Sequence, residues 1–248
     1  MEKIRKKDEY GMLYDCIKEV ADNIVFDNRA TFGDNATFVN NAAFGDNSTF
    51  GDNATFGRYA TFGNGTTFMN GPKFMDGATF GDYTRFGLYA TFGDGTRFGE
   101  GTKFGDCATF GKDTRFGNNT IFSNGSTFGK NAEFGDNTVF ENGTKFLGIT
   151  KFGYGTEFGY HTTFGDGTDF SVDNKWNGIT TDHIYSLSNI DGSGRQINIA
   201  KCNKTSVIKI EAGCFTGTDE QFIERACREN KIDYVMLIGA FCNALKRM

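Results

Sequence analysis

The residues of this chain that could bind or transform a ligand gather at a few places. The stretch Tyr83-Thr84-Arg85-Phe86-Gly87-Leu88-Tyr89 places a guanidinium group between two phenol rings. Aromatic rings beside arginine favour an anionic or planar ligand, or a protein partner. The competing interpretation is that these are ordinary exposed strand residues, selected for β-propensity and solubility. The binding candidates, with a second group near residue 160, are Tyr83, Arg85, Tyr89, Arg97, Lys103, Arg115, Tyr154, Tyr160 and His161.

Catalytic chemistry has little support in the sequence. The chain has two histidines, His161 and His183, which are too few for a three-histidine metal centre. Its six cysteines form no CxxC pair and show no zinc-finger spacing. Cys214 precedes an expected helix and could be a reactive thiol, but we favour a buried cysteine because no histidine lies near it in sequence. P-loop, nucleophile-elbow and dinucleotide motifs are absent, and we expect no enzyme activity, cofactor or metal.

A ladder of phenylalanines determines which elements position these candidates. Phenylalanine stands at every sixth position from Phe26 to Phe170, which accounts for 25 of the 28 in the chain. Val20 and Trp176 continue the same register at the two ends. A fixed short period over this length is typical of a repeat architecture. The sequence therefore predicts one repeat domain over residues 20–176.

Each six-residue unit reads as a short strand followed by a tight bend. A small residue such as Ala30 stands two positions before Phe32, so both point inward while Thr31 points outward. The next residue is usually glycine, and two turn positions follow it. The second turn position favours asparagine or glycine, which tolerate a positive φ. The first favours aspartate or asparagine, which we expect to bond the local backbone and hold the corner.

The unit Phe32-Gly33-Asp34-Asn35-Ala36-Thr37 resembles the hexapeptide repeat of left-handed parallel β-helices, with phenylalanine in the aliphatic place. The resemblance covers residues 20–176. It implies an all-β solenoid of about nine triangular 18-residue coils with a phenylalanine core. Family members are often trimers packed along their prisms, so a homo-oligomer, with a trimer favoured, is expected. Acyltransferases of this family use a catalytic histidine and often a long loop between coils; this repeat has no inserted loop and holds only His161.

Short flanks remain at both ends of the repeat. Residues 1–19 carry apolar residues at helical spacing and predict an N-terminal capping helix. Residues 177–248 predict a small α+β domain, with strands over residues 183–190, 195–201 and 206–211 and helices over residues 218–230 and 234–246. Thr218-Asp219-Glu220-Gln221 predicts a capping box. The stretch from Ile208 to Thr218 resembles a small C-terminal domain of phage and gut-bacterial proteins of unassigned function.

Composition limits the classes of partner. The net charge of −5 gives no bulk attraction to nucleic acid or to an anionic membrane. No run of about 18 apolar residues predicts a membrane span, and the charged N-terminal sequence lacks a signal-peptide core. We expect a cytoplasmic protein, in a host cytoplasm if it is viral. The leading hypothesis is a non-enzymatic scaffold or binding rod; the alternatives are a protein that sequesters a small anionic or nucleotide-like molecule between protomers, an acyltransferase and a DNA mimic.

Overall fold

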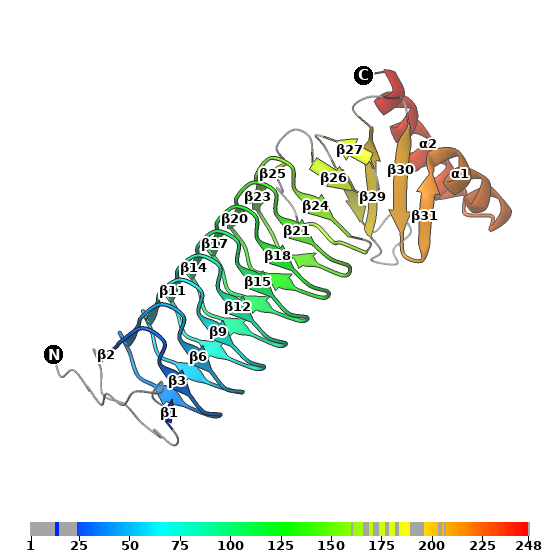
Figure 1. Ribbon diagram of the computed structural model, residues 1–248. Helices are drawn as coiled ribbons and strands as arrows, with labels where there is room; N and C mark the ends of the chain where they lie inside the picture. Colours follow the sequence, from blue (N-terminus) through cyan, green and yellow to red (C-terminus); the bar gives the residue numbers. More distant parts are fainter. Residues whose placement is uncertain are drawn as a thin grey trace.

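The repeat forms a β-solenoid of parallel sheets, as predicted (Figure 1). The computed structural model describes residues 13–14, 24–159, 161–165, 169–170, 174–176, 179–181, 184–188, 196–202, 205 and 207–247. Strands 18 residues apart pair in parallel, so that Phe32 lies opposite Phe50. The solenoid has about eight turns, close to the nine predicted. In the last coil, the second sheet ends in a single bridge to Thr163, while the first continues to Trp176. The left-handed coil sense stays a prediction.

The three sheets follow the three faces of the rod. The first contains β1 (Leu13–Tyr14), β3 (Thr31–Phe32), β6 (Thr49–Phe50), β9 (Thr67–Phe68), β12 (Arg85–Phe86), β15 (Lys103–Phe104), β18 (Ile121–Phe122), β21 (Val139–Phe140), β24 (Glu157–Phe158), β26 (Asn174–Trp176) and β27 (Ile179–Thr181). The second contains β4 (Thr37–Phe38), β7 (Thr55–Phe56), β10 (Lys73–Phe74), β13 (Thr91–Phe92), β16 (Thr109–Phe110), β19 (Thr127–Phe128) and β22 (Lys145–Phe146). The third contains β2 (Val25–Phe26), β5 (Ala43–Phe44), β8 (Thr61–Phe62), β11 (Thr79–Phe80), β14 (Arg97–Phe98), β17 (Arg115–Phe116), β20 (Ala132–Phe134), β23 (Thr150–Phe152) and β25 (Asp169–Phe170).

The rod core consists of three interlocked stacks of phenyl rings. Phe92 stacks on Phe74 and Phe110, one coil before and one coil after it, with ring centroids 5.0 and 4.9 Å apart. It meets Phe86 and Phe98 edge to face, both at 4.9 Å. The stacking distance matches the spacing of neighbouring strands, about 4.8 Å, and both ring arrangements are favourable for aromatic pairs. The six-residue period therefore specifies a continuous aromatic core.

The corner carboxylates and amides hold successive coils together. Our expectation that they bond the backbone of their own corner is wrong. The side-chain oxygen of Asp34 accepts the backbone N–H of Asp52, 18 residues on, at 2.7 Å. Asn64 does the same for Asp82 at 2.7 Å. Because corners stack directly above one another, the nearest N–H group lies in the next coil. The Asp and Asn preference thus provides an inter-coil hydrogen-bond ladder.

The second turn position adopts the left-handed backbone conformation even where the residue is unsuited to it. Cys107 has φ 61° there, whereas Gly125, one coil on, has φ 71°. We expect Cys107→Asn to raise the free energy of unfolding by about 1 kcal/mol, because asparagine tolerates this region better. Cys107→Val is the matched control and should lower it, since a β-branched side chain is least tolerated at positive φ. Urea denaturation of the two variants checks the prediction; an equal effect of both would contradict it.

The C-terminal region is an antiparallel sheet with two helices on one side (Figure 1). The sheet order is β28 (Ile184–Ser188), β29 (Gln196–Lys201), β30 (Ile208–Ala212) and β31 (Phe215–Thr218), and the helices are α1 (Asp219–Arg228) and α2 (Ile232–Arg247). Three strands and both helices match the prediction, but β31 is a fourth strand that it missed. Thr218 and Gln221 form the predicted capping box. We call this region the cap.

The cap sheet separates two cores. One face packs against the helices through Ile197, Ile199, Ile208 and Ile210. From the other face, Ile184 and Ala200 join the phenylalanine core of the rod. The last turn of α2 meets the first turn of α1, where Lys246 Nζ contacts the carboxylates of Asp219 and Glu220, both at 2.7 Å. The pKa of the Glu220 carboxyl is lowered to about 2, mainly because Lys246 donates a hydrogen bond to it.

Both ends of the rod carry strands outside the phenylalanine ladder. Beyond Trp176, β27 folds back antiparallel on β26 and extends the first sheet. The predicted capping helix over residues 1–19 lies outside the described residues, apart from Leu13 and Tyr14. These two residues form β1, parallel to β3, rather than a helical turn.

Candidate functional site

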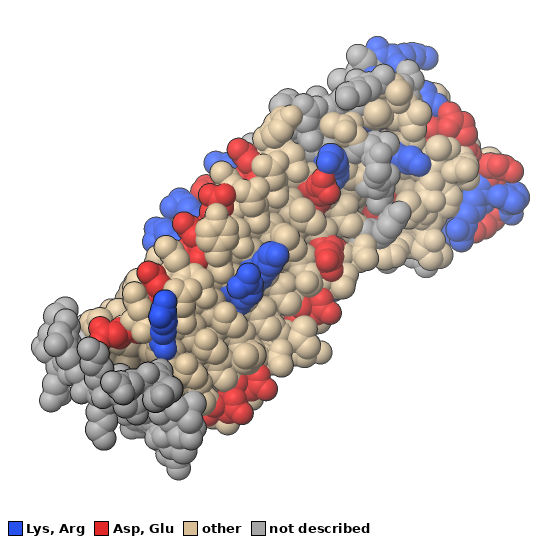
Figure 2. Space-filling model, viewed as in Figure 1, with Lys and Arg blue, Asp and Glu red and all other residues tan. Residues whose placement is uncertain are grey.

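The basic candidates lie midway along the rod on two adjoining faces. Arg85 is the strand neighbour of Lys103 on the first face, and Arg97 is the neighbour of Arg115 on the third. Figure 2 shows basic side chains gathered over β12 and β15. Tyr83 lies at the corner that joins these faces. Among the described residues Arg115 is paired, with Glu133 at 2.9 Å, whereas Arg85, Arg97 and Lys103 have no ion pair there.

One tyrosine of this cluster, Tyr83, has a structural role that the sequence did not suggest. Tyr83 and Tyr89 flank β12 at two different corners, and both have φ 59° and side chains about 60% exposed. The ring of Tyr83 covers Gly101 in the next coil, where an added Cβ would lie 2.6 Å from the ring carbon Cδ1. Tyr59 covers Gly77 in the same way. The rings of Tyr83 and Tyr59 therefore each shield a glycine corner and still present their outer sides to solvent.

The second group of candidates is not brought together. Tyr154 and His161 lie at opposite ends of β24, at different corners, and Tyr160 lies outside the described residues. Tyr154 lines a shallow hollow beside an ion pair between Glu157 and Lys175, whose charged atoms are 2.5 Å apart. His161 instead faces the cap, with Nδ1 3.1 Å from Glu211 Oε1. His183, like Tyr160, lies outside the described residues.

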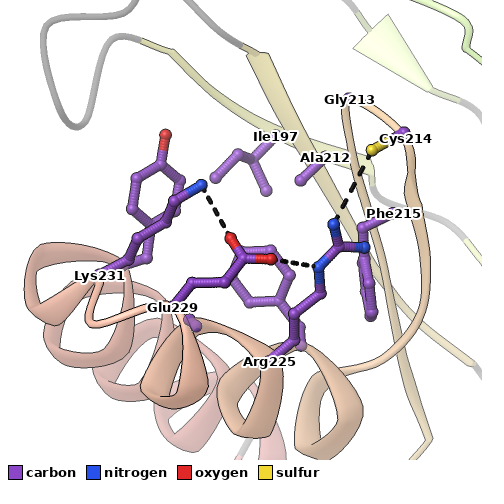
Figure 3. Close-up of a pocket in the computed structure, with 11 residues that line it drawn as sticks. Ile197, Ala212, Gly213, Cys214, Phe215, Arg225, Glu229 and Lys231 are labelled. Carbon is purple, nitrogen blue, oxygen red and sulfur yellow. Dashed lines mark hydrogen bonds and ion pairs between the residues drawn. The ribbon is translucent and has the colours of Figure 1, made fainter.

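The cap contains a cavity of about 250 Å³ between its sheet and α1, which we call the cap pocket (Figure 3). Two local motifs build its mouth. A two-residue turn, with Gly213 at φ 60° followed by Cys214, joins β30 to β31. At the end of α1, Asn230 has φ 53° and Lys231 donates its N–H to the carbonyl of Ala226, a Schellman arrangement that turns Lys231 back over the helix end.

Charged groups line one side of the cap pocket. Glu229 accepts a hydrogen bond from Arg225 Nε at 2.7 Å and contacts Lys231 Nζ at 3.1 Å through its other oxygen. The hydrogen bond to Arg225 is the main cause that lowers the pKa of the Glu229 carboxyl. Arg225 also reaches Cys214 Sγ at 3.9 Å. Two cations thus face one carboxylate, which leaves a surplus of one positive charge.

The remaining walls of the pocket are apolar and aromatic. They come from Ile197, Ala212, Phe215, Phe222, Ala226 and the ring of Tyr234. The guanidinium of Arg225 lies 5.9 Å from the centre of the Phe215 ring. Cys214 is exposed, so our expectation of a buried cysteine is wrong. The hairpin turn causes this exposure, because Cys214 occupies the turn itself and contributes no side chain to the sheet.

Few sequence signals predict this pocket. Arg225 and Glu229 have the i, i+4 spacing of a helical ion pair, but such pairs are common on exposed helix faces. Lys231 and Tyr234 belong to the next helix and its connection. Only the packing of α1 on the sheet brings them to the turn at Cys214.

Comparisons with protein-family models, curated proteins and solved structures found no match to this chain. The two family resemblances therefore rest on their own motifs. Among the described residues, no helix is long and apolar enough to cross a membrane. Nor do the described histidine, cysteine, aspartate and glutamate side chains form a group of three able to hold a metal ion.

Proposed function

We propose that the protein is a non-enzymatic β-helix rod that acts as a scaffold through protein interaction, and that its cap associates with a second copy of the chain. The repeat positions support a scaffold role, because phenylalanines and small residues fill the core and corner side chains bond successive coils. A cytoplasmic location and an accessory or particle-associated role, of the kind suggested by the C-terminal resemblance, belong to the same proposal.

The observation that carries the association is an exposed apolar face on α2. Ile232, Met236 and Leu237 are between 53% and 69% exposed. Exposed apolar side chains gathered on one element favour an interaction site. The outward positions of the rod faces, by contrast, carry mostly threonine and charged residues.

The pattern along α2 fits a second copy packed antiparallel. The small, exposed residue Ala240 stands at the middle of the helix, where a two-fold axis would bring the two backbones closest. Asp233 is near the start and Arg247 ends the helix. In an antiparallel pair, Asp233 would therefore lie near Arg247 of the partner subunit.

We expect a dimer in native mass spectrometry, and Met236→Glu should weaken it by at least about tenfold, since a charge would be buried in the contact. Met75→Glu is the matched control, because Met75 is similarly exposed but lies on the rod, and it should leave the dimer intact. A monomer, or a trimer that survives Met236→Glu, would contradict association through α2. A trimer is the arrangement implied by packing along the prisms.

The sequestering alternative places a small anion near the Tyr83 corner, between protomers. Its support is that Arg85, Arg97 and Lys103 lack ion pairs among the described residues. The same mass spectra test it, because a co-purified anion would add its mass to the oligomer, whereas a bare polypeptide mass counts against it.

A further inference from the structure

We propose that the cap pocket binds a small carboxylic acid with an apolar body. The cavity of about 250 Å³ has roughly the volume that eight water molecules occupy in the liquid. A small organic molecule matches this space. Apolar walls with a few polar groups at one side are the usual composition of a small-molecule site.

The charge at the mouth favours a monoanion. Both oxygens of Glu229 are already engaged, one by Arg225 and one by Lys231. Within the part of the chain that the structure describes, the guanidinium nitrogen Nη2 of Arg225 has only the long contact to Cys214 Sγ, at 3.9 Å. Figure 3 shows that this edge of the guanidinium points across the mouth toward the turn at Gly213 and Cys214. Its planar N–H groups match a carboxylate, and one negative charge would balance the surplus positive charge.

The ring of Tyr234 closes one end of the cavity. Tyr234 lines the pocket and is only 6% exposed. The ammonium group of Lys231 lies 5.6 Å from the centre of this ring. Tyr234 therefore adds aromatic surface beside the charged groups of the mouth.

The apolar body of the acid would rest against the aromatic wall. The side chains of Phe215 and Phe222 meet edge to face with ring centroids 5.2 Å apart and form one side of the cavity. Ile197 and Ala226 contribute further apolar surface. A flat ring or a branched aliphatic group fits these walls better than a sugar, whose hydroxyls would lose their hydration there.

The test uses the full chain with phenylacetate, 4-hydroxyphenylacetate and isovalerate as probes, and phenylacetamide as the neutral counterpart. Titration calorimetry measures binding, and peptide mass spectrometry follows alkylation of Cys214 by iodoacetamide. We expect at least one acid to bind saturably and to slow alkylation of Cys214, with Cys107 on the rod unaffected. The affinity for the amide should be at least about tenfold lower, because the amide lacks the charge that faces Arg225.

Two substitutions on α1 locate the binding. Arg225→Gln should weaken the acid by about tenfold or more, whereas Arg228→Gln is the control, because Arg228 lies on the same helix outside the pocket lining. Thermal unfolding verifies that each variant is folded. The proposal is overturned if no probe binds, if the amide equals the acid, or if the two arginine variants have the same affinity.

Discussion

Replacing one central phenylalanine, Phe92→Ala, should lower the free energy of unfolding by about 3–5 kcal/mol, the range for deleting a buried aromatic side chain. Phe92 is 2% exposed and lies in the middle of the rod. Its removal would interrupt the stack between Phe74 and Phe110 and also remove four edge-to-face contacts. The rings cannot close the gap, because the strand ladder fixes their spacing.

Urea denaturation followed by far-UV circular dichroism measures this effect. The neighbouring residue supplies the control: Thr91 points outward, and Thr91→Ala should change the free energy by no more than about 0.5 kcal/mol. A solenoid is stabilised mainly by contacts between adjacent coils. We therefore expect Phe92→Ala also to divide the transition, with the coils on either side of the break unfolding at different urea concentrations. A single transition shifted by less than 1 kcal/mol would mean that the core repacks around the gap.

The repeat could be predicted from sequence because its information is local and redundant. Every hexad repeats the same choice of inward, outward and corner residues, so the sheet pairing of Phe32 with Phe50 follows from the period alone. The capping box at Thr218 is equally local, since Thr218 and Gln221 bond within one helical turn. Such features need no knowledge of what packs against them.

The features that sequence reasoning missed depend on neighbours distant along the chain. Sequence alone predicts that the Asp and Asn side chains bond their own corner, but their partner is the next coil, which the residues of a single hexad do not specify. It also predicts a buried Cys214, yet the pairing of β30 with β31 puts this residue in an exposed turn. The cap pocket likewise requires three separate segments to meet, so no single sequence motif predicts it.

The cap also completes the open end of the rod. Where the second sheet stops, the side chain of Asn198 donates to the carbonyl of Thr162, and that of Gln196 donates to the carbonyl of Phe164, both at 2.6 Å. Glu211 accepts the backbone N–H of His161. These three contacts replace the next coil for backbone groups that would otherwise lack a strand partner. An uncovered solenoid end is an unpaired sheet edge and favours aggregation.

The apolar half of this junction predicts the second large effect. Ala200 is fully buried and meets the rod core from the cap sheet. Ala200→Glu should lower the free energy of unfolding by about 3–5 kcal/mol, because it buries a charge without a partner. Trp176, the single tryptophan of the chain, is fully buried at this end of the rod and reports on the junction. We expect its fluorescence to shift to longer wavelength in native buffer as the cap separates from the rod and water reaches the indole.

Cys227→Glu is the matched control, because Cys227 lies in the cap on α1 but is exposed. It adds the same charge to the cap and should leave both the emission wavelength and the unfolding free energy nearly unchanged. If Ala200→Glu behaves like this control, the cap does not seal the phenylalanine core. If instead the emission shifts while the circular dichroism of the rod persists, the cap can separate from the rod without unfolding it. The rod would then hold its coils without it but expose its last ring stack and the carbonyls of Thr162 and Phe164.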